Sequence, residues 1–145
     1  MLDNAEREEP MAGVRGSCLC GGVKFEITGP LMKPLNCHCV QCRKQHGAAF
    51  RSRVRVRVDD FKWLQGEDLV KYHETSPRLR RGFCGNCGSP IVNRPSAVAE
   101  FGVPLGILDD DPGARLAEHV FVSEKPAWSE ITDHLPQHER LPKGV

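Results

Sequence analysis

The stretch Cys84-Gly85-Asn86-Cys87-Gly88 has the spacing of a zinc knuckle, in which glycines let backbone amides approach two sulfur ligands. Two more cysteine clusters precede it, Cys18-Leu19-Cys20 and Cys37-His38-Cys39-Val40-Gln41-Cys42. Close spacing of this kind aims several thiolates at one ion. A single C-x-C is a weak signal, whereas three clusters in one chain of 145 residues strongly indicate metal binding.

The number of cysteines predicts two different sites. Structural zinc takes four soft ligands, and catalytic zinc takes three plus an exchangeable position, so the seven cysteines divide into one closed and one open site. The two outer pairs together make a four-cysteine site, and the middle cluster supplies three corners of a tetrahedron within six residues. We therefore assign Cys18, Cys20, Cys84 and Cys87 to a structural zinc, and Cys37, Cys39 and Cys42 to a catalytic zinc, giving two zincs per chain.

Other uses of cysteine fit less well. A disulfide framework usually has an even number of cysteines and needs an oxidising compartment. A thioredoxin-like pair would need its C-x-x-C in a βαβ setting, which the sequence does not predict. An iron–sulfur cluster also uses four cysteines, and composition alone leaves that alternative open. The knuckle spacing favours zinc.

Length, charge and hydropathy limit the class of protein. A chain of 145 residues forms one domain, which we place at residues 14–145 after an acidic tail at residues 1–13. The 20 Lys and Arg residues nearly balance the 19 Asp and Glu residues, which indicates neither nucleic acid nor a membrane surface as partner. No apolar run is long enough to span a membrane, and the acidic start is not a secretory signal, so we expect a reduced, cytoplasmic protein. The sequence does not indicate an oligomeric state.

Alternating apolar residues between glycine and proline turns predict a mainly β fold of small coiled sheets held together by zinc. A zinc shared by Cys20 and Cys84 would tie the start of the chain to its middle, so losing it should unfold the domain. We expect short helices at Val40–His46, ending at Gly47, and at Trp128–His134. The expected strands are 23–27, 50–58, 69–73, 78–83, 91–92, 97–107 and 119–122.

The open site favours sulfur chemistry. Three thiolates leave Zn²⁺ with a net charge of about −1, which weakens it as a Lewis acid toward water. A soft, electron-rich zinc suits a further sulfur ligand, and a thiol bound there would lose its proton and remain nucleophilic. We therefore expect activation of a substrate thiol for attack on a small carbonyl compound, or cleavage of the resulting carbon–sulfur bond.

The segments Gly16–Val23, Cys37–Arg43 and Arg81–Gly88 resemble the glutathione-dependent formaldehyde-activating enzyme family, which includes centromere protein V. Segments 106–110 and 119–122, with Trp128 and residues 134–136, fit it as well. The resemblance implies an Mss4-like fold, the same two zinc sites, and a carbon–sulfur lyase activity that forms or splits S-(hydroxymethyl)glutathione from glutathione and formaldehyde. A noncatalytic zinc module that binds a partner is the alternative, because fold does not fix activity.

A series of alternating arginines in the strand at residues 50–58 departs from the family pattern, in which apolar or small residues are commoner. We call this series the arginine comb; its members are Arg51, Arg53, Arg55 and Arg57. The comb could bind carboxylates of a thiol substrate, but a solvated strand face is the favoured interpretation. Contact with nucleic acid is less favoured still, because no aromatic residue interleaves the arginines.

Several residues beside the cysteines need a structure to interpret. Alternation in an extended turn would point His38 away from the metal, and His46 is either a proton carrier or a solvent-facing turn residue. Positive charges that could offset the thiolates are Arg43 and Lys44. The residues expected in the core are Phe101, Phe121 and Trp128.

Overall fold

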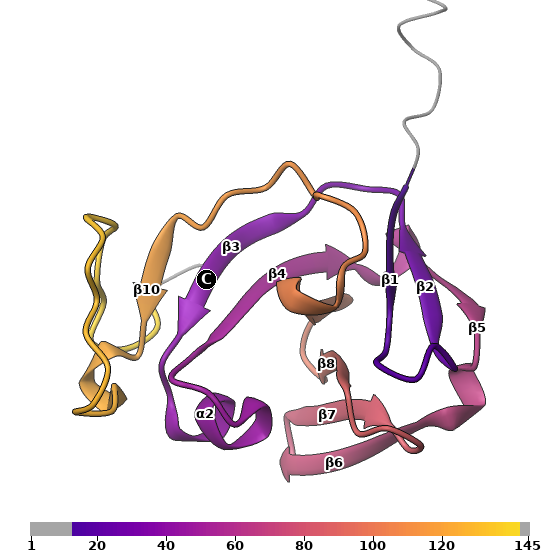
Figure 1. Ribbon diagram of the computed structural model, residues 1–145, viewed down its shortest axis with the longest axis horizontal. Helices are drawn as coiled ribbons and strands as arrows, with labels where there is room; N and C mark the ends of the chain where they lie inside the picture. The colour runs from indigo at the N-terminus through magenta and orange to yellow at the C-terminus, as the bar shows by residue number, and fades with distance from the viewer. Residues whose placement is uncertain (1–12, 143–145) are drawn as a thin grey trace, which may run out of the picture.

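A computed structural model describes residues 13–142 of the chain and confirms a mainly β fold (Figure 1). Apart from Gly13, the expected tail lies outside the described residues. The strands are β1 (Val14–Ser17), β2 (Lys24–Ile27), β3 (Met32–Cys37), β4 (Arg51–Arg57), β5 (Phe61–Gln65), β6 (Val70–Ser76), β7 (Leu79–Cys84), β8 (Pro90–Pro95), β9 (Glu100–Pro104) and β10 (Glu118–Val120). The helices are α2 (Val40–His46) and the 3-10 turns η1 (Val58–Asp60), η2 (Glu67–Leu69), η3 (Leu105–Ile107) and η4 (Val122–Glu124).

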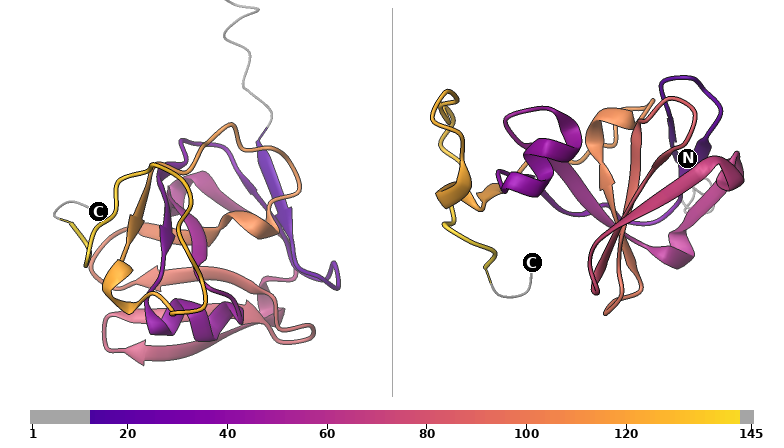
Figure 2. Two further views of the ribbon diagram at one scale, coloured as in Figure 1. Left: turned by 60° about the vertical axis from the view of Figure 1, so that its left-hand side comes forward. Right: turned by 90° about the horizontal axis from the view of Figure 1, so that it is seen from below.

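The strands form two sheets of unequal size. A three-stranded antiparallel sheet has the order β1-β2-β5, and a seven-stranded sheet has the order β10-β3-β4-β9-β8-β7-β6. The small sheet lies at one end of the molecule and β10 at the other, with β3 and β4 running between them (Figures 1 and 2). β10 pairs in parallel with β3, whereas the other pairs of the large sheet are antiparallel.

The main core lies where the two sheets meet. Val54 and Val56 of β4 are fully buried and pack in the same cluster as Phe25 of β2. Phe61 stacks on Phe25 and meets Phe101 edge-on, with ring centroids 4.8 and 5.2 Å apart. Because side chains alternate along a strand, burying the valines of β4 turns its arginines toward the opposite face of the large sheet.

Most elements expected from the sequence are present, with changed ends. Helix α2 begins after Cys39, whose sulfur accepts from the Cys42 amide, and ends at Gly47, which adopts a left-handed conformation with φ 59°. The strand patterns correspond to β2, β4 and the five strands from β6 to β10. No strand was expected at β1, β3 or β5, because their alternation is interrupted or short.

The helix expected at Trp128–His134 is wrong. This segment contains only bends and an isolated turn, in which the Ser129 amide donates to the Pro126 carbonyl oxygen. The carboxylate of Asp133 accepts from the Leu135 amide at 3.0 Å, a local bond that competes with a helical one. Trp128 was expected in the core but is 72% exposed, so no apolar face holds a helix against the sheets.

Phe101 is buried as expected, and Phe121 is half-buried against the smaller core cluster that contains Leu35 and Val120. Of the helices within residues 13–142, none combines the length and apolar character needed to cross a bilayer.

Candidate metal centres

Four sulfur atoms from two distant turns meet beside the small sheet. The group consists of Cys18 and Cys20, from the turn between β1 and β2, and Cys84 and Cys87, from the turn between β7 and β8; its ligand atoms all lie within 4.8 Å of one another. The sulfurs of Cys18 and Cys20 are 3.5 Å apart, and those of Cys20 and Cys84 are 3.9 Å apart. A tetrahedron with Zn–S bonds near 2.3 Å has edges of about 3.8 Å, so this group fits a zinc ion.

Backbone amides approach these sulfurs as a knuckle requires. The Val23 amide donates to Cys18 Sγ at 3.2 Å, and the Asn86 amide donates to Cys84 Sγ at 3.4 Å. Gly88 closes the second turn with φ 83°, a conformation that favours glycine, and its amide donates to the Cys84 carbonyl oxygen. These contacts hold the cysteines of two turns in place, although Cys20 itself is exposed.

Three further sulfur atoms gather where β3 meets α2. Cys37 ends β3, Cys39 caps the helix and Cys42 lies in its first turn, and their sulfurs are within 4.8 Å of one another. Across residues 13–142, no histidine, aspartate or glutamate joins this group. Three thiols leave one corner of a tetrahedron without a protein ligand, so the group fits a metal that keeps an exchangeable position.

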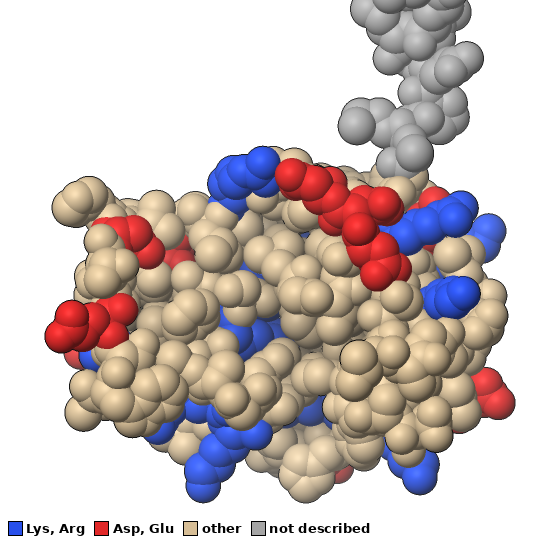
Figure 3. Space-filling view, in the orientation of Figure 1, with Lys and Arg blue, Asp and Glu red and all other residues tan. Residues whose placement is uncertain are grey.

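The three-cysteine group forms part of a cavity of about 260 Å³, which we call the arginine pocket. In the space-filling view, atoms of Lys and Arg lie at the bottom of a hollow near the centre of one face (Figure 3). The polar lining consists of Cys37, Cys39, Cys42, Gln41, Asn93, Arg51, Arg53, Arg55 and Arg81, and the rest is Leu79, Pro95, Gly102, Val120, Phe121 and Leu141.

The arginine comb faces this pocket, so its favoured interpretation as a solvated strand face is wrong for its first half. Arg51 and Arg53 are each only 6% exposed, and Arg55 is half-buried. Arg57, at the other end of the comb, is exposed. The alternation itself was predicted correctly, but the sequence does not reveal that the arginine face of β4 lines a pocket together with residues of α2, β7, β8 and β10.

Pairing across the large sheet brings a fourth arginine to the arginine pocket. Arg55 lies opposite Gly102, Gly102 opposite Asn93, and Asn93 opposite Arg81, so these residues form one row on one face. The glycine in this row makes room, because a Cβ at Gly102 would lie 3.1 Å from Nη2 of Arg51. Arg81 is thereby placed beside the cysteines although it lies 39 residues from Cys42 in sequence.

Arg51 and Arg81 act on the sulfur atoms electrostatically. Arg81 Nη1 lies 3.8 Å from Cys42 Sγ, and its Nη2 donates to Gln41 Oε1 at 3.1 Å. With its oxygen turned toward the two guanidinium groups, the Asn93 amide accepts from Arg51 and Arg81 at 3.3 and 3.1 Å. Hydrogen bonds from the Cys37 and Cys39 thiols lower the pKa of Cys42, and the charges of Arg51 and Arg81 lower it further.

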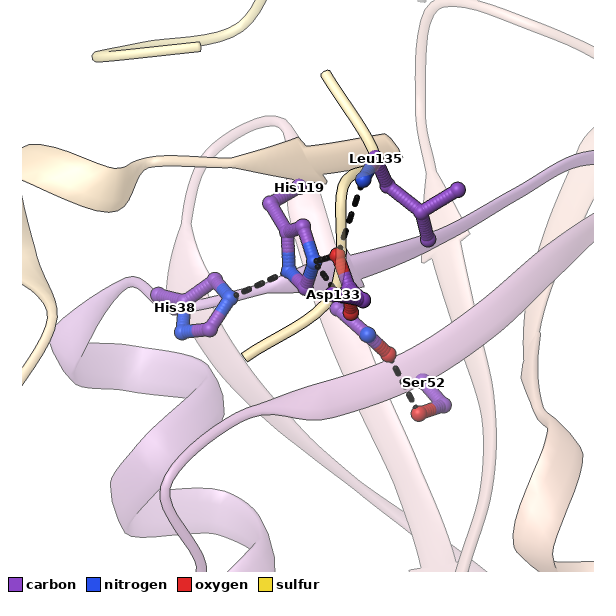
Figure 4. Close-up of polar contacts among 6 residues, drawn as sticks. His38, Ser52, His119, Asp133 and Leu135 are labelled. Atoms are coloured by element: carbon purple, nitrogen blue, oxygen red, sulfur yellow. Dashed lines mark hydrogen bonds and ion pairs between the residues drawn. The ribbon is translucent and has the colours of Figure 1, made fainter. Parts of the chain in front are cut away.

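His38, His119 and Asp133 form a chain of polar contacts (Figure 4). His38 is fully buried, and its Nε2 is 2.9 Å from Nδ1 of His119, whose Nε2 is 3.0 Å from Asp133 Oδ1. The Leu135 amide and then His119 lower the pKa of Asp133, so its carboxylate is ionised at neutral pH and accepts from His119. His38 thus turns away from the metal site, as alternation predicted.

His46 and the two basic residues of α2 differ from expectation. Burial and then the charge of Arg51 lower the pKa of His46 to about 4, so it is not a solvent-facing residue or a proton carrier near neutral pH. Arg43 donates to the Glu124 carbonyl oxygen at 3.0 Å, and Lys44 is exposed. The contacts that offset thiolate charge come instead from Arg81 and Arg51.

The sequence analysis missed three residues of this region: Arg81, His119 and Asp133. Arg81 belongs to the quoted segment that resembles the family, but nothing local gives its direction. The apolar run Val120-Phe121-Val122 that follows His119 could have indicated a short strand buried on both faces. Asp133 was hidden by the incorrect helix, because its role depends on the bend that replaces it.

Comparison with known proteins gives three findings. A family model described as glutathione-dependent formaldehyde-activating enzyme matches residues 13–124. A protein of Halomonas elongata, provisionally named a glutathione-dependent formaldehyde-activating enzyme, is 29% identical over 127 residues, which cover 81% of this chain and 80% of that protein. A crystal structure of a Rhodobacter sphaeroides protein matches with a TM-score of 0.57 and 22% identity, covering 67% of this chain and 89% of that one, which shows a shared fold.

Proposed function

We propose that this chain, which belongs to the glutathione-dependent formaldehyde-activating enzyme family, is a zinc-dependent carbon–sulfur lyase that forms or splits a thiol adduct of a small carbonyl compound. Glutathione is the leading thiol and formaldehyde the leading carbonyl compound, following the family description and the name of the Halomonas elongata relative. We place the reaction at Cys37, Cys39 and Cys42, and a structural zinc at Cys18, Cys20, Cys84 and Cys87. The free thiols suit a reducing, cytoplasmic setting.

The observation that carries this proposal is the three-cysteine group inside the arginine pocket. A group with a missing fourth ligand, lining a cavity of about 260 Å³, can admit a small molecule to the metal. The four-cysteine group has a complete ligand set, with a buried sulfur on each of its two turns. The contrast supports catalysis at one group and structural binding at the other.

The reaction balances without an oxidant or reductant. A carbon–sulfur bond forms between the thiol sulfur and the carbonyl carbon, the carbon–oxygen double bond becomes single, and the thiol proton ends on the oxygen; splitting reverses these changes. Zinc bound by the three cysteines would supply a Lewis acid that favours the deprotonated thiol. Arg51 and Arg81, buried beside the sulfurs, stabilise the negative charge that a thiolate adds to the site.

NMR exchange spectroscopy of glutathione mixed with formaldehyde tests the activity. We expect the zinc-loaded protein to raise the exchange rate between glutathione and its hydroxymethyl adduct, and Cys42→Ala to return that rate to the value without protein. Leu19→Ala, at a residue 87% exposed beside the four-cysteine group, is the matched control and should retain the increase. An exchange rate that the wild-type protein leaves unchanged removes glutathione and formaldehyde as substrates, and favours a noncatalytic zinc module if other thiols give the same result.

A further inference from the structure

Three arginines of the arginine pocket are buried without a carboxylate partner. Arg51, Arg53 and Arg81 are 6%, 6% and 7% exposed, and none of them forms an ion pair with a carboxylate of residues 13–142. Taking a guanidinium out of water is costly unless an anion or several hydrogen bonds replace the water. The pocket therefore holds positive charge that needs a negative counterpart.

The sulfur atoms provide that counterpart for two of the three. Arg81 Nη1 lies 3.8 Å from Cys42 Sγ, and Arg51 lies directly opposite Cys37 in the pairing of β3 with β4. Three thiolates around a divalent zinc carry a net charge of about −1, and a substrate thiolate would make it about −2. Two guanidinium groups match that charge, so Arg51 and Arg81 are accounted for by the metal site.

Arg53 is the guanidinium that remains. It lies two residues beyond Arg51 on the same face of β4, a displacement of roughly 7 Å along the strand. Its one hydrogen bond among the described residues is from Nη1 to the Lys33 carbonyl oxygen at 3.3 Å, which leaves most of its donors free. Burial and then the charge of Arg51 lower the pKa of Arg53 to about 10, so it is still charged at neutral pH.

The other half of the arginine comb differs from Arg53. Arg55 pairs with Glu100 at 3.3 Å, and Arg57 pairs with Asp60 at 3.9 Å. The comb therefore contains two arginines that already have carboxylate partners, one beside the sulfurs, and Arg53, which lines the pocket without an anion.

We propose that Arg53 binds a carboxylate of the substrate, so that the arginine pocket selects small thiols carrying a carboxylate several bonds from the sulfur. This proposal rests on the proposed function for the thiol, and it adds the group that the protein recognises beside it. A guanidinium binds a carboxylate through two parallel hydrogen bonds, which fixes the direction of the molecule as well as its charge. The sulfur would then lie toward Cys42 and the carboxylate toward Arg53.

Calorimetric titration of zinc-loaded protein with two matched thiols tests the proposal. The ligands are 3-mercaptopropionate and 3-mercapto-1-propanol, which differ by replacement of the carboxylate with a hydroxymethyl group. We expect the wild-type protein to bind the carboxylate roughly tenfold or more tightly, as is typical of a charge-assisted contact. Succinate, which has no thiol, is titrated separately as a probe of the carboxylate contact alone.

The variants separate this contact from a general charge effect. Arg53→Met should bind both thiols with the low affinity that the wild type has for 3-mercapto-1-propanol. Arg53→Lys should keep part of the preference for 3-mercaptopropionate. Arg57→Met also removes one positive charge from β4, but outside the pocket. This variant should still prefer the carboxylate thiol to the alcohol as strongly as the wild type does. Because Arg53 is buried without an anion, we expect Arg53→Met to melt at the wild-type temperature or above it, so the variant remains testable.

Each outcome decides the proposal. Equal binding of the two thiols by the wild type, or full discrimination by Arg53→Met, overturns it. If neither thiol binds, succinate decides the carboxylate contact by itself, and the NMR exchange measurement with glutathione decides the proposed function separately. Succinate binding that Arg53→Met abolishes and Arg57→Met retains supports the contact, whereas absence of succinate binding overturns it as well.

Discussion

The two cysteine groups offer the same kind of ligand, but they differ in how far apart their cysteines lie in sequence and in how deeply the cysteines are buried. The four-cysteine group joins turns that are 64 residues apart between Cys20 and Cys84, and one of its cysteines is exposed. The three-cysteine group comes from one segment of six residues, with Cys37 and Cys42 buried beneath arginines. A metal shared by distant turns constrains the whole chain, whereas a metal held by one segment constrains only that segment.

The two cysteine groups differ in the chemical groups that contact their sulfur atoms, as well as in the number of ligands. Backbone amides support the sulfurs of Cys18 and Cys84, as expected for a site that only has to hold its metal. Guanidinium groups surround the sulfur of Cys42, as expected for a site where further negative charge arrives.

Removing a ligand of the four-cysteine group should have the largest effect. Cys84→Ala separates the turn of β7 and β8 from that of β1 and β2, and we expect the domain to lose its cooperative fold, because binding at such a site contributes about 10 kcal/mol or more to folding. Circular dichroism and the dispersion of amide NMR signals measure this. A Cys84→Ala protein with native signal dispersion would show that this group does not hold the sheets together.

Removing a ligand of the three-cysteine group should leave a folded protein. For Cys42→Ala we expect the zinc content to fall from two per chain toward one, with native circular dichroism, because β3 remains paired with β4 and β10 in the large sheet. Metal analysis of protein purified under reducing conditions measures the content. If Cys42→Ala and Cys84→Ala unfold the chain equally, the distinction between the two groups is lost.

Disrupting the polar contacts among His38, His119 and Asp133 should have a smaller effect on stability. His119→Phe leaves the buried Nε2 of His38 without its partner, which typically costs about 1–3 kcal/mol of stability. Urea denaturation measures the cost, and His134→Phe, at an exposed histidine of the neighbouring segment, is the control. If the three-cysteine group holds zinc as proposed, we expect the metal to leave it faster in His119→Phe, because His38 lies between Cys37 and Cys39 in the sequence. Equal rates of zinc release from His119→Phe and from the wild type would mean that these polar contacts stabilise the fold without positioning the cysteines.

The smallest predicted effect is on how the free energy of unfolding depends on pH. The pKa of His46 is about 4 in the folded protein and near 6.5 when unfolded, so the unfolded chain binds a proton first as the pH falls. His46 therefore lowers the unfolding free energy between pH 6.5 and 4, by about 1–2 kcal/mol at pH 5. His46→Gln should remove this loss, measured as the difference in urea midpoint between pH 7 and pH 5 for the two proteins. Equal pH dependence in both would show that His46 titrates normally.

The sequence predicted those features that depend on local spacing. The alternation in residues 50–58 is enough to give β4 and to separate its valines from its arginines. The cysteine clusters predicted which sulfurs would meet, and the structure brings together the same two sets. That both sets bind zinc, and that one is catalytic, remain proposals.

Features that depend on which residues pack against one another in the fold were not predictable from the sequence. The exposure of Arg53 depends on the other walls of the arginine pocket, which include residues of β7, β8 and β10 that lie far from β4 in sequence. The same holds for Arg81, which reaches the cysteines through a row of cross-strand pairs. The core position expected for Trp128 and the helix expected at 128–134 were both wrong, because the sequence does not show whether this segment has a surface to pack on.

Stepwise removal of metal from the wild-type protein tests the difference between the two groups most directly. Zinc release to a chelator and circular dichroism are followed together as the chelator concentration rises. We predict two zincs per chain, with one leaving while the circular dichroism stays native and the second leaving only as the protein unfolds. Simultaneous loss of both zincs with the fold, or loss of both from a protein that stays folded, would contradict one structural and one exchangeable site.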